Sequence, residues 1–286
     1  MSATTINYCQ FSFSPWEGCT KISDGCTNCF AEQRDKRHLT EKVDHWGPGA
    51  PRRRTSAAYW RQPLKWNRDY RTALDSDSDI VPSRPRVLCP TLGDWLDPEV
   101  CSEWRSDLLC LIRATPNLTW MLLSKRPEGF AARLNRVAEL DDFGSRIARE
   151  WIEGRPPANV WVGASVENQE MADKRIPELL AIPAAKRWLS VEPMLGPVDI
   201  HLFSHMGDPR QINPNYLRSE CKISWVVCGG ESGPGCRPMD PAWMRSLKDQ
   251  CAAAGVPFWA KQLGGHPNPR HALVDLSADL RTRQLP

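Results

Sequence analysis

The chain has 286 residues, of which 41% are hydrophobic and 25% charged, and its formal net charge at pH 7 is +3. A chain of this length can bury a large core, and its charge neither requires nor excludes a nucleic-acid partner. No apolar run approaches the roughly 18 residues of a membrane-spanning helix. Because residues 1–10 lack the pattern of a secretion signal, we expect a cytoplasmic protein, in which clustered cysteines indicate metal binding or catalysis.

Short apolar runs recur along the chain and predict strands. They lie at about 10–15, 86–90, 119–124, 159–165, 186–192, 223–230 and 256–262. Each run is apolar through most of its length, which is typical of strands buried on both faces of a parallel sheet. The alternation with helical segments predicts βα units, and hence an α/β barrel or open α/β sheet with functional residues at the carboxyl ends of its strands.

Helices are expected between these runs, at 31–41, 97–116, 168–182 and 240–255. Asp97 and Asp240 are each followed by Pro, which predicts that both are N-caps. We expect Pro177 to interrupt the third helix. Two loop-like segments, 44–85 and 196–222, are interpreted as insertions in a single domain that covers 1–286.

Three cysteines lie close together in the stretch SPWEGCTKISDGCTNCFAEQR. Cys19, Cys26 and Cys29 have the spacing C-x6-C-x2-C, and three thiolates can hold three irons of a four-iron cluster while the fourth iron stays open for a ligand. The alternatives are a zinc site completed by His38, Cys9 or a distant cysteine, and no metal at all. The position between a strand and a helix favours a catalytic cluster.

Polar residues follow each expected strand, and we call them the rim residues. They are Asp94; Ser124, Lys125 and Arg126; Ser165, Glu167 and Asn168; Glu192; Gly229, Gly230 and Glu231; and Lys261 and Gln262. The carboxylates are candidates for an amino group or ribose hydroxyls, and the cations for a carboxylate or phosphate. Gly229 and Gly230 would let a ligand approach the backbone. The alternative is a set of salt bridges within the fold.

The segment 52–71 interleaves cations with aromatic residues, which is typical of nucleic-acid contacts. The candidates are Arg52, Arg53, Arg54, Trp60 and Trp66. The alternative is an amphipathic surface segment whose Trp side chains pack on the domain.

The chain resembles a family carried by phages and bacteria, usually described as a phage protein or domain of unknown function and treated as radical-SAM-like. The matching stretches are SPWEGCTKISDGCTNCFAE, LLSKRPE, VWVGASVENQ, RIPELLAIPAAKRWLSVEPMLGPVD and WVVCGGESGPGCRPMDPAWMRSLKDQCAAAGVPFWAKQLG, spread from about residue 8 to 265. The resemblance implies a partial TIM-like (βα)6 barrel of radical SAM type, with parallel strands and loop insertions. It also implies a [4Fe–4S] cluster and S-adenosylmethionine (SAM).

By the resemblance, Cys19, Cys26 and Cys29 ligate the cluster, and the rim residues contact SAM or substrate. We expect catalytic roles for Glu192, Glu231 and Lys125. Cofactor contacts are expected from Asp94, Ser165, Glu167, Asn168, Glu192, Gly229, Gly230 and Glu231. Most radical SAM enzymes have the spacing C-x3-C-x2-C with an aromatic residue before the last Cys, whereas here Asn28 precedes it. Phe30 or Trp16 is expected to replace that aromatic near adenine.

The resemblance further implies a SAM-cleaving enzyme that modifies or isomerises a nucleic-acid base, such as an amino-acid-decorated thymine in phage DNA. We expect an external electron donor of flavodoxin or ferredoxin type, a monomer without membrane attachment, and a location in the host cytoplasm if the gene is phage-borne. The alternatives are radical chemistry on a peptide or amino acid, repair of a DNA lesion, and a zinc-stabilised DNA-binding protein without catalysis.

Overall fold

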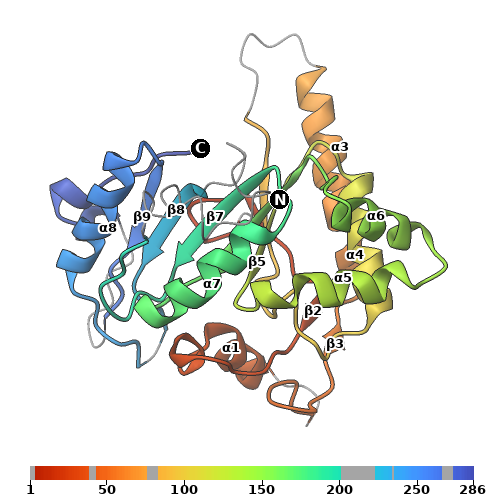
Figure 1. Cartoon of the computed structure of the whole chain (residues 1–286), viewed down its shortest axis with the longest axis horizontal. Coiled ribbons are helices and arrows are strands. Elements are labelled where there is room, and N and C mark those ends of the chain that lie inside the picture. The colour runs from red at the N-terminus through yellow and green to blue at the C-terminus, as the bar shows by residue number, and fades with distance from the viewer. Residues whose placement is uncertain (1–3, 39–42, 76–82, 201–222, 234, 266–272) are drawn as a thin grey trace, which may run out of the picture. The chain divides into compact units, whose positions relative to one another are not determined.

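The computed structural model, drawn in Figure 1, describes residues 4–38, 43–75, 83–200, 223–233, 235–265 and 273–286. Its main sheet has the strand order β1-β4-β5-β6-β7-β8-β9. The strands are Phe11–Ser12 (β1), Arg86–Cys89 (β4), Thr119–Ser124 (β5), Val160–Ser165 (β6), Lys186–Val191 (β7), Ile223–Gly229 (β8) and Phe258–Gln262 (β9). Each lies within an expected run, and β1–β4, β4–β5, β7–β8 and β8–β9 pair in parallel. The predicted α/β class with parallel strands is therefore confirmed.

From β4 to β9 the strands follow one another in the sheet as they do in the chain, which is the order of a βα barrel. This order agrees with the expected partial barrel. A (βα)6 barrel has six strands, whereas this sheet has seven, because the two-residue β1 joins its edge. A second, antiparallel sheet pairs β2, Trp16–Glu17, with β3, Arg53–Arg54. The expected insertion 44–85 thus contributes a strand beside the cysteine loop.

The helices are α1 Phe30–His38, α2 Ala57–Trp60, α3 Gln62–Leu74, α4 Ser102–Ala114, α5 Phe130–Ala138, α6 Phe143–Ile152, α7 Gln169–Ala181 and α8 Pro241–Ala253. Asp240 caps α8 as predicted, because its carboxylate accepts the Ala242 N–H at 2.8 Å. The cap predicted at Asp97 is wrong, since α4 begins five residues later, after Cys101. The predicted interruption at Pro177 is also wrong, because α7 continues through it.

The chain divides into two compact units, each built from separate segments. The first comprises Met1–Thr20, Arg34–Val162 and Pro183–Ala185, and the second comprises Lys21–Gln33, Gly163–Ile182 and Lys186–Pro286. The boundaries fall inside β6 and inside the cysteine loop, so Cys19 belongs to the first unit, and Cys26 and Cys29 belong to the second. Whether 1–286 acts as a single domain stays a prediction, and of the expected insertion 196–222 only residues up to 200 are described.

Aromatic side chains fill the core of the first unit. Trp95 and Trp151 are fully buried and stack with their ring centroids 5.8 Å apart, and Phe130 packs edge-on against Trp151 at 5.4 Å. These residues lie on or beside α5 and α6, which pack on each other and on α4. The high Trp content of the sequence therefore serves packing, since a buried aromatic ring removes a large apolar area from water.

The core of the second unit also depends on Trp. A Cβ at Gly163 in β6 would lie 2.4 Å from the Trp188 ring of β7, so only glycine leaves space for that ring. Trp188 in turn packs on Trp225 of β8 at a centroid distance of 6.0 Å. Helix α8 covers β8 and β9 within the same unit. Among the described residues, no helix is long and apolar enough to cross a membrane.

Gly230 gives a testable consequence of the close backbone contact between the ends of β8 and β9. Its N–H donates to Gln262 at 2.9 Å, and a Cβ there would lie 1.9 Å from the carbonyl oxygen of Leu263. Backbone cannot move aside cheaply, so we expect Gly230→Ala to destabilise the protein by about 1–3 kcal/mol. Thermal unfolding would show this as a fall of roughly 2–10 °C in Tm. The control is Gly196→Ala, where a Cβ meets nothing within 4 Å; equal Tm values for the two variants would contradict the expectation.

Candidate metal and cofactor site

Cys19 is fixed at the carboxyl end of β4 in the first unit. The preceding Gly18 has φ +107°, and its N–H donates to Leu92, which lies three residues beyond β4, at 3.0 Å. A Cβ at Gly18 would lie 2.3 Å from the His45 carbonyl oxygen, so this approach requires glycine. The backbone of Cys19 forms an isolated parallel β-bridge with Trp46. The backbone on both sides of the thiol is thereby held at the strand end.

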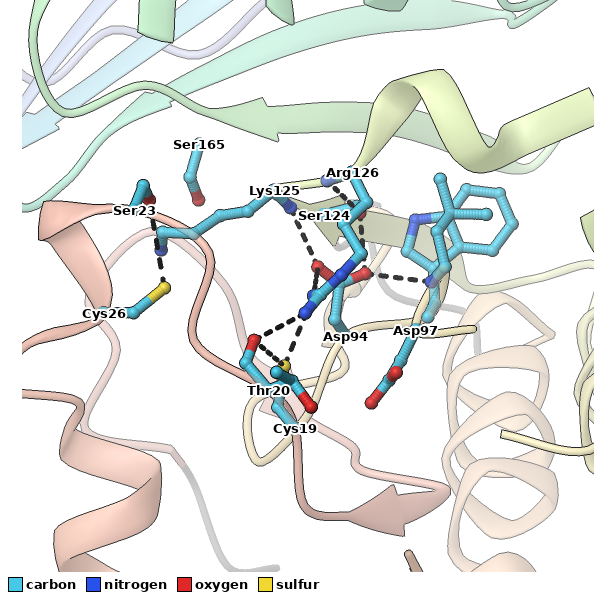
Figure 2. A network of polar contacts seen from close by, with 12 residues as sticks. Cys19, Thr20, Ser23, Cys26, Asp94, Asp97, Ser124, Lys125, Arg126 and Ser165 are labelled. Carbon is cyan, nitrogen blue, oxygen red and sulfur yellow. Dashed lines mark hydrogen bonds and ion pairs between the residues drawn. The ribbon is translucent and has the colours of Figure 1, made fainter. Parts of the chain in front are cut away.

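The Cys19 sulfur contacts a buried ion pair. Figure 2 shows the Arg126 guanidinium between Asp94 and Cys19, with Nη1 at 3.1 Å from Asp94 Oδ2 and 3.3 Å from Cys19 Sγ. Arg126 Nη2 donates to the Thr20 carbonyl oxygen at 2.5 Å. Asp94 also accepts hydrogen bonds from Ser124 Oγ at 2.6 Å and from the Lys125 N–H at 2.9 Å. The residues at the end of β5 are thus tied through Asp94 to Cys19.

The surroundings of Cys19 oppose its ionisation. Burial, reinforced by the Asp94 carboxylate, raises the pKa of the thiol to about 12, while the Arg126 guanidinium acts in the opposite direction. A metal-bound cysteine is a thiolate. Because guanidinium is a permanent cation with donors only, Arg126 is suited to stabilise negative charge on this sulfur.

In the second unit, the segment that carries Cys26 and Cys29 is held from two strand ends. The first contact is Glu167, two residues beyond β6, whose carboxylate is fully buried. Its Oε1 accepts the Gly25 N–H at 3.4 Å, and its Oε2 accepts Arg175 Nη1 of α7 at 2.7 Å. A Cβ at Gly25 would lie 2.9 Å from Glu167 Cδ, so glycine permits this contact.

The second contact is Glu231, two residues beyond β8. Its Oε2 accepts Asn28 Nδ2 at 2.9 Å, and Arg237 binds both carboxylate oxygens, with Nη2 at 2.7 Å from Oε1. The same Nη2 donates to the Asp24 carbonyl oxygen at 2.8 Å. Asn28, which replaces the expected aromatic before Cys29, is therefore part of the anchor of this loop.

Other predicted residues also have roles within the fold. Asn168 is the N-cap of α7, since its Oδ1 accepts the Met171 N–H at 3.0 Å, and the Ser165 carbonyl oxygen accepts Arg175. Glu192 forms an ion pair with Lys261. The adenine contact predicted for Trp16 is wrong, because its ring is fully buried, whereas Phe30 is 56% exposed at the start of α1.

The rim carboxylates therefore each have a cationic partner within their own unit. The pairs are Asp94–Arg126, Glu167–Arg175, Glu192–Lys261 and Glu231–Arg237. Sequence reasoning missed Arg175 and Arg237. The signal for Arg175 is its place on the helix that follows Glu167, and the signal for Arg237 is its position six residues after Glu231 in the sequence. Gly229 and Gly230 likewise face protein rather than open space, since a Cβ at Gly229 would lie 3.3 Å from Lys261 Cβ.

The predicted nucleic-acid contacts divide into buried and accessible residues. Arg52 is buried and gives all its guanidinium nitrogens to protein acceptors, among them Asp97 at 2.7 Å and the carbonyl oxygens of His45, Gly47 and Ala50. The prediction is wrong for Arg52, which has no donor left for a phosphate. Trp66 is also buried and stacks on Phe11 at 4.3 Å, so a base cannot reach it.

Arg53, Arg54 and Trp60 are less enclosed. Arg53 pairs with Glu17 and with Asp35. Arg54 pairs with Asp107 at 2.7 Å and lies over the Trp60 ring at 4.5 Å. A nucleic-acid contact through these three residues stays a prediction.

Over the described residues, no group of three or more His, Cys, Asp or Glu side chains could hold a single metal ion. A four-iron cluster places a different demand on its ligands, because its cysteines bind separate irons. Three cysteine thiols on one short loop are the donor set that such a cluster takes.

The Glu231 anchor predicts how stability depends on pH. Burial would raise the pKa of Glu231, but hydrogen bonds from Arg237 and Asn28 outweigh it and lower the pKa below 4.5. As the pH falls, Glu231 is therefore protonated in the unfolded chain before it is protonated in the folded protein. The stability that the ionised carboxylate contributes above pH 4.5 is lost on further acidification. We expect Glu231→Gln to lower the free energy of unfolding at pH 7 by about 1–2 kcal/mol, and to lose less further stability on acidification.

Urea unfolding between pH 3 and pH 7 measures both effects. The control is Glu178→Gln, which changes an exposed carboxylate on α7. An acid dependence that is the same in Glu231→Gln and wild type would contradict the anchor.

Comparison with known proteins gives one match. A family model described as "Protein of unknown function (DUF5131)" matches residues 3–284. No curated protein and no solved structure matches the chain.

Proposed function

The chain belongs to the DUF5131 family, and because that family's description names no activity, we propose from the chain's own residues that it is a radical SAM enzyme. Cys19, Cys26 and Cys29 would hold a [4Fe–4S] cluster, and the rim residues would surround SAM and the substrate. The fold would be a partial βα barrel of radical SAM type. When bound, the cluster would supply the electron that cleaves SAM to a 5′-deoxyadenosyl radical.

One observation carries this proposal: within each unit, the cysteine-bearing segment lies at the carboxyl ends of parallel strands. Cys19 is held there by Arg126 after β5. The segment with Cys26 and Cys29 is held by Glu167 after β6 and Glu231 after β8. The carboxyl ends of strands are where βα proteins gather their chemistry.

The residues around the thiols would have defined tasks. Arg126 holds the Cys19 sulfur and offsets its negative charge when it binds iron, and hydrogen bonds to cluster sulfurs are one means by which proteins set the reduction potential. Asp94 fixes Arg126, so we assign it a positioning role. Lys125, Glu192 and the exposed Phe30 remain the proposed contacts with SAM or substrate, since Lys125 contacts Asp94 through its backbone N–H and not through its side chain.

The three cysteines provide the direct test of the proposal. After anaerobic reconstitution with iron and sulfide, we expect a brown protein that absorbs near about 400 nm and cleaves SAM to 5′-deoxyadenosine. Cys19→Ala, Cys26→Ala and Cys29→Ala should each lose SAM cleavage by a factor of at least about 100, because an incomplete ligand set cannot hold a stable open iron. Cys101→Ala, which changes an exposed cysteine, should behave as wild type. A colourless protein with one zinc per chain would refute the proposal.

We further propose that the substrate is a nucleic-acid base, either modified or rearranged by the radical. The support is the accessible cations and aromatic rings of Arg53, Arg54 and Trp60, since cations bind phosphates and aromatic faces stack bases. An isomerase would regenerate SAM, whereas an oxidative enzyme would consume it. A flavodoxin- or ferredoxin-type protein would donate the electron.

Nucleoside analysis tests the substrate class. Phage or host DNA from cells that express the wild-type protein should contain a nucleoside that is absent when Cys26→Ala is expressed. Mass spectrometry of digested DNA would detect it, and its mass would distinguish an isomer from an oxidised product. Identical nucleoside profiles, combined with full SAM cleavage by the purified wild type, would refute the nucleic-acid substrate and leave peptides or amino acids.

A further inference from the structure

Helix α3 presents a row of cations that the sequence-based candidates did not include. Arg61, Lys65, Arg68 and Arg71 lie in or directly before α3, and all four are exposed. With one acidic residue, Asp69, the stretch 61–74 carries a net charge of +3, which equals that of the whole chain. Three aspartates follow the helix in the sequence at Asp75, Asp77 and Asp79, so the excess of positive charge belongs to the helix itself and not to the longer segment 61–79.

The row lies on one side of the helix. At 3.6 residues per turn, Arg61, Lys65 and Arg68 fall within about 60° of one another, with Arg71 next to them. The opposite side holds Trp66, which is buried and stacks on Phe11 with parallel rings 4.3 Å apart. The apolar side therefore fixes the helix to the first unit, and the cationic side faces solvent.

Within the described ranges, three of these cations have no carboxylate partner. Lys65 pairs with Asp69, but in the part of the chain that is described, no acidic residue pairs with Arg61, Arg68 or Arg71. Several surface arginines elsewhere do have a carboxylate partner, as in Arg146–Glu150, Arg155–Glu153 and Arg245–Asp279, and what distinguishes α3 is that its unpaired arginines lie together on one side of a helix. An ordinary solvated helix face would mix the two signs of charge, so this face is suited to a polyanion.

The last turn of α3 is exposed to solvent. All five side chains from Arg71 to Asp75 are exposed. In Figure 1 the C-terminal part of α3 extends past α4 and α6, which belong to the same unit. An extended partner therefore has access along the cationic side.

We propose that this cationic side of α3 binds the phosphate backbone of a nucleic acid. The inference rests on the proposed function, because it specifies how a nucleic-acid substrate would be held. From Arg61 to Arg71 the helix rises about 15 Å. A nucleic-acid strand presents a phosphate about every 3.4 Å of duplex axis, so the row faces about four phosphates.

A membrane surface is the other polyanion to consider, and the helix argues against it. Interfacial helices bury an apolar side in the lipid while their cations lie at the headgroups. Here Trp66 and Pro63 are already buried in the protein, and the exposed Leu64 and Leu74 are two separate apolar side chains, not a continuous apolar side. A nucleic acid needs only the cationic side, because its backbone is bound by charge and hydrogen bonds.

The experiment measures binding of the full-length protein to fluorescently labelled single-stranded and duplex DNA by anisotropy at several salt concentrations. The triple variant R61Q/R68Q/R71Q should bind at least tenfold more weakly, and the slope of log K against log salt should fall by about 2–3. R61K/R68K/R71K should bind nearly as wild type, since charge is retained. The matched control, R146Q/R155Q/R245Q, removes the same charge from compensated arginines and should change binding little.

Each contrary outcome has a separate meaning. Unchanged binding by R61Q/R68Q/R71Q, or an equal loss in the control variant, would overturn the α3 assignment while a nucleic-acid substrate stands. Absence of DNA binding by wild type, with binding to phosphatidylserine vesicles instead, would overturn both. SAM cleavage without DNA should be the same in the triple variant and wild type, so failure of the radical SAM proposal would be recognised independently.

Discussion

Buried ion pairs at strand ends are the interaction on which the candidate site depends. A charged pair taken out of water stabilises a structure only when its remaining donors and acceptors are also satisfied. The Asp94 carboxylate meets this condition because it accepts from the Leu96 and Lys125 N–H groups, the Ser124 hydroxyl and the Arg126 guanidinium. The Glu231 carboxylate accepts from the Asn28 amide and from the backbone N–H and guanidinium of Arg237. Both pairs contact the cysteine loop and thereby fix backbone that lies outside the regular strands.

This arrangement reconciles two interpretations of the rim residues that the sequence left open. Asp94, Glu167 and Glu231 act as structural groups, since each is paired with a cation and contacts the cysteine loop directly or through that cation. Glu192, which pairs with Lys261, has no such contact and remains a proposed contact with SAM or substrate. Arg126 connects a structural carboxylate to a proposed iron ligand, because one nitrogen of its guanidinium contacts both the Asp94 carboxylate and the Cys19 sulfur. Removal of such a pair would therefore affect ligand geometry as well as stability.

The strands could be predicted from the sequence because strands buried on both faces need continuous apolar runs, and all seven expected runs contain a strand. The actual role of Asp97 could not be predicted, because a carboxylate that suits the start of a helix equally suits a buried guanidinium. Its partner, Arg52, lies 45 residues away in the chain. The same limit applies to Trp66. Its neighbours in sequence are basic, but its contact with Phe11 is made across the fold and removes it from any base.

Arg52 also has a consequence for how the chain can vary. Its guanidinium gathers three backbone carbonyl oxygens from residues 45–50, together with Thr20 Oγ1 and Asp97. A carbonyl oxygen is present whatever the side chain, so Arg52, which lies two residues beyond the loop, fixes this backbone by contacts that do not depend on the loop's side chains. Substitutions in that loop should be tolerated best where the backbone is ordinary, whereas Gly47 and Gly49, with φ of +102° and +73°, should stay glycine. Arg52 and Asp97 should change only together.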